Sequence, residues 1–150
     1  MPEPVTKQFL AFETKAIDAE KRQLTALAST AIVDRDNEIV QPEAIRAAIP
    51  GYMKNPVILA NHQHRLSDGH SSVVANCVKA WVDKKGFWIT IEFVKGTDLG
   101  DEYWMLYSKK IQRAFSIGFR ILDGHSESIE GKQVYIITKL ELFEISCVAI

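Results

Sequence analysis

The sequence predicts a mainly β domain with a few helices, arranged as a barrel or half-barrel. Apolar and polar residues alternate over several short segments, which is the period of strands with one buried face. Short polar turns separate neighbouring segments, as in β-hairpins. Signals for the start of a helix are few. A chain of 150 residues with 47% hydrophobic residues is long enough to bury a hydrophobic core. We therefore expect one domain that spans residues 1–150.

The N-terminal part is predicted to begin with a hairpin. Residues 7–17 and 23–33 are strand-like, and the polar turn 18–22 separates them. A polar loop follows at residues 34–37. A short helix over residues 42–48 then begins at a proline, which suits the first helical position, and ends at the Pro-Gly pair that follows.

The middle of the chain is predicted to hold one strand, a second hairpin and a second helix. Residues 56–61 form a short apolar strand that leads into a polar loop. Residues 72–82 and 86–94 flank a turn of sequence Asp-Lys-Lys-Gly, which predicts the hairpin. Thr97 caps a helix that runs to about residue 110.

The C-terminal part is predicted to return to strands. Residues 114–119 form a strand, residues 123–132 a polar loop, and residues 134–150 one long strand or two. In the first strand, alternation sends the three large apolar side chains into a core. Ser116 is left on the other face between Ala114 and Gly118.

Ser116 is the first candidate for chemistry. A hydroxyl between two small side chains is displayed as a nucleophile would be, with room for a substrate strand to approach. An ordinary strand serine looks the same, and no Gly-x-Ser-x-Gly pattern surrounds this one. A serine nucleophile needs a base, which is most often histidine. His62 follows an apolar strand that would fix its backbone, whereas His64, His70 and His125 lie in polar loops.

Glu144 is the candidate third member of such a site. Within residues 141–148, alternation places Leu142, Glu144, Ser146 and Val148 on one face and Phe143, Ile145 and Cys147 on the other. A carboxylate in so apolar a strand is costly to bury without a partner, and a histidine that becomes cationic would be one. The alternative is an exposed glutamate on an edge strand.

His62 and His64 also permit a metal-site interpretation. Residues two apart on an extended chain share a face and could both bind zinc, with Asp36, Asp68 or His70 completing the site. No His-Glu-x-x-His motif and no cysteine pair supports this interpretation. The sequence therefore predicts neither a metal nor a cofactor.

Composition argues against several classes of function. The formal net charge of −1 gives no electrostatic basis for binding nucleic acid or an anionic membrane. No apolar run approaches the roughly 20 residues of a spanning helix. The N-terminus lacks the basic and apolar regions of a signal peptide. Cys77 and Cys147 form no Cys-x-x-Cys motif, which predicts reduced thiols in a cytosolic compartment.

Several short segments also occur in a distinctive order. They are Asp36-Asn37-Glu38-Ile39-Val40-Gln41-Pro42-Glu43-Ala44, Asn55-Pro56-Val57-Ile58-Leu59 leading into His62, Asp83-Lys84-Lys85-Gly86-Phe87, Thr97-Asp98, Ala114-Phe115-Ser116-Ile117-Gly118-Phe119 and Leu142-Phe143-Glu144-Ile145-Ser146-Cys147-Val148. In order and spacing they resemble the prohead protease family of tailed bacteriophages. The resemblance covers about residues 24–148.

This resemblance implies a β-barrel or half-barrel of the herpesvirus-assemblin type and a serine endopeptidase that cleaves scaffold or capsid-protein segments during prohead maturation. It assigns the catalytic serine to Ser116, the histidine to His62 and the acidic residue to Glu144. The implied substrates are the phage scaffold, the major capsid protein and the chain itself by self-cleavage. A homo-oligomer is compatible with it, and neither nucleic acid nor membrane is an expected partner. The implied location is the immature capsid in the host cytoplasm.

Two alternatives stay open. A non-enzymatic β-barrel assembly module of a phage particle would keep the fold without any need for Ser116, His62 and Glu144 to meet. A metal-dependent hydrolase would use His62 and His64 instead.

Overall fold

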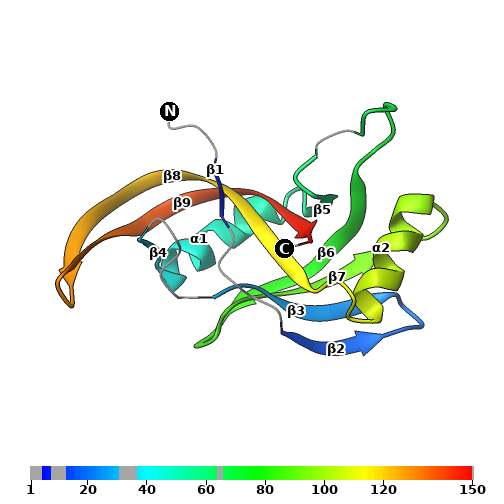
Figure 1. Cartoon of the computed structure of the whole chain (residues 1–150), viewed down its shortest axis with the longest axis horizontal. Helices are drawn as coiled ribbons and strands as arrows, with labels where there is room; N and C mark the ends of the chain where they lie inside the picture. The colour runs from blue at the N-terminus through cyan, green and yellow to red at the C-terminus, as the bar shows by residue number, and fades with distance from the viewer. Residues whose placement is uncertain (1–4, 8–12, 31–36, 64–65, 150) are drawn as a thin grey trace.

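A computed structural model describes residues 5–7, 13–30, 37–63 and 66–149, which form nine strands and two helices (Figure 1). The strands are β1 (Val5–Lys7), β2 (Thr14–Asp18), β3 (Gln23–Thr30), β4 (Glu38–Val40), β5 (Val57–Ala60), β6 (Val73–Val82), β7 (Gly86–Phe93), β8 (Ala114–Ile129) and β9 (Lys132–Val148). The helices are α1 (Pro42–Tyr52) and α2 (Asp98–Ser108). Parts of the first two predicted strands lie outside the described residues, as do Asp36 and His64.

The strands form one open, curved sheet in the order β1-β8-β9-β5-β6-β7-β3-β2, and β4 pairs with β9 beside this path. Strands β4 and β5 run parallel to β9, and the other pairs are antiparallel. The sheet curves so far that β3 and β8 contact each other, although they are not hydrogen-bonded neighbours. The prediction of a mainly β barrel or half-barrel with a few helices is therefore confirmed, and the open sheet corresponds to the half-barrel.

An aromatic cluster joins helix α2 to β7 and to β8, the strand that carries Ser116. Tyr107 is buried, and its ring centroid lies 5.9 Å from that of Phe93 in β7 and 5.1 Å from that of Phe115 in β8. The Tyr107 hydroxyl also donates a hydrogen bond to the Ala114 carbonyl. These contacts fix the start of β8 and hence the backbone on either side of Ser116.

Several predicted local features are present. The hairpins β2–β3 and β6–β7 form around the two predicted turns. The Thr97 hydroxyl accepts a hydrogen bond from the Gly100 N–H at 3.0 Å, as expected of the residue that caps α2. Neither helix in the described part of the chain has the length and apolar character needed to cross a membrane.

Helix α1 is longer than predicted, because it continues through Pro50 and Gly51 to Tyr52. Pro50 lacks the N–H that would bond to the Arg46 carbonyl, so the helix continues past it with one internal hydrogen bond fewer. The last turn is also anchored from outside, since Tyr52 is buried and its hydroxyl donates to the Val57 carbonyl at 2.9 Å. Tertiary contacts thus override the local stop signal.

The prediction of a loop at residues 123–132 is wrong. Strands β8 and β9 stay paired as far as Ile129 and Lys132, and only Glu130 and Gly131 form the turn. Both turn residues have positive φ, as in a tight hairpin. Figure 1 shows this ribbon projecting from the rest of the sheet. A projecting two-stranded ribbon can carry polar residues on both faces, so its sequence looks like that of a loop.

Candidate active site

The candidate site lies on one face of the β8–β9 pair. Ser116 is paired with Ser146, and Gly118 is paired with Glu144. The residues between them in both strands belong to the hydrophobic core. Ser116, Gly118, Glu144 and Ser146 therefore share the opposite face, which we call the site face.

A β-bulge at Phe143 determines which residues of β9 reach the site face. Gly118 pairs with Glu144, but Phe119 pairs with Leu142, so Phe143 is an extra residue in the ladder. Leu142 consequently points into the core, and Phe143 is 37% exposed. Simple alternation placed these two side chains the other way round. It placed Glu144 and Ser146 correctly, because both follow the bulge.

His62 reaches this site from the end of β5. Strand β5 lies parallel to β9, with Leu59 beside Ser146. The chain then enters a tight turn in which Asn61 and His62 have φ of 53° and 63°, and the Gln63 N–H donates to the Ala60 carbonyl at 3.0 Å. Two successive residues with positive φ are the signature of a type I′ turn.

Two contacts attach His62 to the site face. Its backbone N–H donates to Ser146 Oγ at 3.2 Å. Its ring Nδ1 lies 2.6 Å from Glu144 Oε1, although the two residues are 82 positions apart in the chain. The Glu144 side chain is 8% exposed and the His62 side chain 23%. A carboxylate this buried and this close to Nδ1 fixes the orientation of the imidazole ring.

The second ring nitrogen of His62 is available for chemistry. Nε2 is buried and has no hydrogen-bond partner among the described residues. No hydrogen bond therefore joins it to Ser116 in this structure, although Ser116 is the cross-strand neighbour of the serine that binds the His62 backbone. Catalytic hydrogen bonds are often loose until substrate binds. Ser116 and Glu144 thus lie on the same face, and His62 contacts that face through Glu144 and Ser146.

Gly118 provides the space for the Glu144 side chain. A Cβ atom at Gly118 would lie 2.6 Å from Glu144 Cγ. The expected room for a substrate strand above this glycine is therefore occupied by the carboxylate. Strand β1 pairs with the second edge of β8, with Thr6 beside Gly118.

The remaining candidates lie elsewhere. His70 is exposed in its loop. His125 is half-exposed, and its Nε2 lies 3.3 Å from Glu127 Oε1. Within the described ranges, no three His, Cys, Asp or Glu side chains form a group that could hold a metal ion, and His64 lies outside those ranges.

Sequence reasoning did not assign a role to Ser146 or Asn61. Ser146 could have been found because it shares a predicted face with Glu144.

The two cysteines are free and buried. Burial raises the pKa of the Cys77 thiol to about 11. Burial also raises the pKa of the Cys147 thiol, well above its ordinary value. Because the thiolate is the nucleophilic form, neither cysteine is a competing nucleophile at neutral pH.

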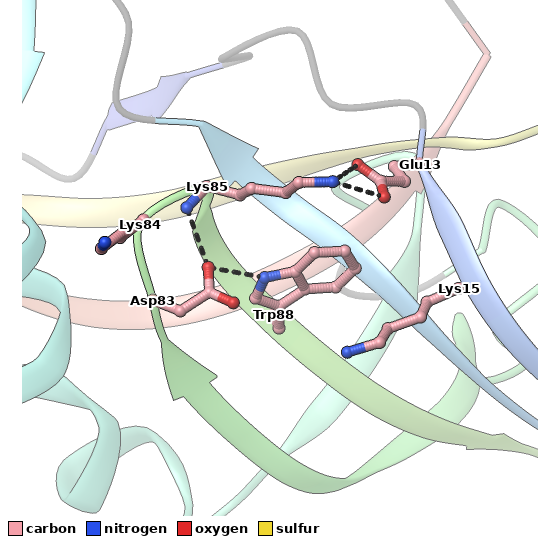
Figure 2. Close-up of a pocket in the computed structure, with 6 residues that line it drawn as sticks. All are labelled: Glu13, Lys15, Asp83, Lys84, Lys85 and Trp88. Carbon is pink, nitrogen blue, oxygen red and sulfur yellow. Dashed lines mark hydrogen bonds and ion pairs between the residues drawn. The ribbon is translucent and has the colours of Figure 1, made fainter.

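A pocket of about 330 Å³ opens at the β6–β7 turn (Figure 2). The carboxylate of Asp83 accepts hydrogen bonds from the Trp88 indole at 2.8 Å and from the Lys85 N–H at 2.9 Å. The Lys85 ammonium pairs with Glu13 at 3.0 Å. Asp83 thus binds the turn backbone and Trp88, and Lys85 binds Glu13, so these contacts stabilise the hairpin turn. The lining of the pocket contains none of the candidate residues.

Comparison with known proteins gives the family. Residues 11–150 match the family described as caudovirus prohead serine protease. The chain is 32% identical over 142 residues to the prohead protease of Escherichia phage T5, with 91% of this chain and 63% of that protein covered. It is 29% identical over 150 residues to the capsid polyprotein of Pseudomonas phage PAJU2, with 96% of this chain and 20% of that protein covered.

The fold is also found in a solved structure. The bacteriophage T4 capsid assembly protease superposes with a TM-score of 0.66 at 11% identity, and the match covers 99% of this chain and 98% of that one. The chain spans less than two thirds of the length of the T5 and PAJU2 relatives. The match over residues 11–150 establishes that this chain belongs to the caudovirus prohead serine protease family.

Proposed function

We propose that this protein is a serine endopeptidase that cleaves scaffold or capsid-protein segments during phage prohead maturation. The observation that carries the proposal is the 2.6 Å contact between His62 Nδ1 and Glu144 Oε1 on the face that presents Ser116. Family membership and the names of the T5 and PAJU2 relatives support the choice of substrate.

In the proposed mechanism Ser116 Oγ attacks the carbonyl carbon of the scissile peptide bond. His62 Nε2 takes the hydroxyl proton and then gives it to the leaving amine, so that an acyl-enzyme remains. The same nitrogen then takes a proton from a water molecule, whose oxygen attacks the ester carbonyl. His62 Nε2 gives this proton to the Ser116 oxygen as the acyl–oxygen bond breaks. Throughout, Glu144 accepts the hydrogen bond from Nδ1–H and stabilises the imidazolium form of His62.

The neighbouring strand limits how a peptide substrate could reach the site. The open groove of about 600 Å³ between the second half of α1 and the stretch of β9 that ends at Phe143 has none of Ser116, His62 and Glu144 in its lining. A substrate segment that joined the sheet at β8 would have to replace β1, which has only three residues. Self-cleavage, a homo-oligomer and action inside the immature capsid of the host cytoplasm belong to the same proposal and are supported by the family resemblance alone.

A fluorophosphonate probe tests the proposal without knowledge of the natural substrate. Activated serines react with such probes, so we expect one added probe mass on the peptide that contains Ser116. His62→Ala should reduce the labelling to a small residual rate, because the hydroxyl then lacks its base. Ser29→Ala, which removes another buried serine hydroxyl, should leave it unchanged. Absence of labelling in the folded wild-type protein would favour the non-enzymatic assembly module.

Chelation is expected to leave peptide cleavage unchanged, since the proposed chemistry uses only serine, histidine and carboxylate groups. The measurement is cleavage of a capsid-protein precursor before and after dialysis against EDTA, together with elemental analysis of the purified protein. Loss of activity that added zinc restores would instead support a metal site built on His62 and His64.

A further inference from the structure

We propose that Ser146 is a positioning residue that holds His62 in the conformation needed to act on Ser116. This inference rests on the proposed serine-protease function and adds a fourth side chain to its machinery. Ser146 is fully buried in β9, two residues after Glu144. It is the residue of the site face that pairs with Ser116 and also bonds to His62.

The turn that carries His62 needs support at this point. A non-glycine residue with positive φ is uncommon, and here Asn61 and His62 both have it. Such conformations persist when surrounding contacts determine them, and they occur often at functional sites. The Ala60 and Asn61 N–H groups donate to the carbonyls of Ser72 and Cys147, both at 2.9 Å. These two bonds fix the entry to the turn but not His62 itself.

Ser146 supplies the missing contact at His62. Its Oγ accepts the His62 N–H at 3.2 Å, whereas Glu144 Oε1 holds Nδ1 of the same residue at 2.6 Å. One contact fixes the backbone and the other fixes the ring. Both come from the site face of one strand, so they set the direction in which Nε2 points.

The hydrogen bond that its hydroxyl accepts explains why residue 146 is a serine better than the size of the side chain does. Alanine would fit a fully buried strand position at least as well, and it would need no hydrogen-bond partner. A serine at position 146 gives the part-buried His62 N–H an acceptor that the strand ladder does not offer. A buried N–H without an acceptor is disfavoured, so the turn would relax if the hydroxyl were removed.

Pairing with Ser116 gives this contact a mechanistic consequence. Directly opposed residues in antiparallel strands have Cβ atoms about 4.5–5.5 Å apart. The strand ladder therefore fixes Ser146 relative to Ser116, and the hydrogen bond fixes His62 relative to Ser146. Ser146 sets the separation between nucleophile and base through these two rigid links.

The test measures the rate at which a fluorophosphonate probe phosphonylates Ser116, along with kcat and KM for a capsid-derived peptide. For Ser146→Ala we expect the labelling rate and kcat to fall by about 10- to 100-fold, as small misplacement of reacting groups can cause. KM should stay within about twofold, because the hydroxyl does not bind the substrate. Ser146→Thr, which keeps the hydroxyl, should recover most of the rate. Ser29→Ala is the matched buried-serine control.

Ser146→Cys guards against a folding defect, since it keeps the size of the side chain but offers only a weak acceptor. We expect it to lose activity like Ser146→Ala while melting close to the wild type. In a His62→Ala background, Ser146→Ala should change the residual rate by less than about twofold, because it acts through His62. Wild-type rates in folded Ser146→Ala or Ser146→Cys would overturn the inference. Wild-type protein that is not labelled at Ser116 would instead overturn the proposed function.

Discussion

Replacing Ser116 with alanine is expected to abolish cleavage of a capsid-protein precursor. Removing the nucleophile of a serine protease typically lowers kcat by about 10⁴- to 10⁶-fold, because no other group can form the acyl-enzyme. The fold should persist, since alanine is smaller than serine and fits the same strand position, and the core neighbours on either side are untouched. Product formation is followed by mass spectrometry, and the melting temperature is measured on the same samples.

Ser29→Ala is the control for this experiment, because Ser29 is also a buried strand serine, 1% exposed like Ser116. It should cleave at the wild-type rate. Undiminished cleavage by Ser116→Ala would remove this residue from the mechanism and leave the site face without a nucleophile assignment.

The orientation of Ser116 was predictable from the sequence because it depends on local periodicity. Phe115, Ile117 and Phe119 do lie in the core, as alternation requires. Periodicity failed at Leu142 and Phe143, where one extra residue shifts the register between β8 and β9. A bulge is a property of two paired strands, so a single strand's sequence does not reveal it.

The approach of His62 to Glu144 could not be derived from spacing. It depends on the parallel pairing of β5 with β9, which joins segments more than 80 residues apart. The family resemblance predicted both residues, whereas local pattern identified each as a separate candidate. The role of Ser146 depends on the turn at Asn61 and His62, whose positive φ values no pattern in the sequence analysis predicted.

Replacing Glu144 with glutamine is expected to lower kcat by about 10³- to 10⁴-fold with little change in KM. Glutamine has nearly the same shape but carries no charge, so it no longer stabilises the imidazolium form of His62. Its amide can also present N–H₂ to Nδ1, which favours the wrong tautomer of the ring. The effect should be large because the carboxylate is 8% exposed and little screened by water. Steady-state kinetics on a capsid-derived peptide measure both constants.

Two further variants separate the role of this carboxylate from a general effect on β9. Glu141→Gln removes an exposed glutamate three residues away that pairs with Arg120, and it should leave kcat within about twofold of the wild type. Gly118→Ala keeps the charge of Glu144 but adds a Cβ atom 2.6 Å from its Cγ, so it must displace the carboxylate from His62. We therefore expect Gly118→Ala to lose activity although every proposed catalytic group is present. If Glu144→Gln cleaves at the wild-type rate, the glutamate is only a buried strand residue, and the base must be oriented by another group.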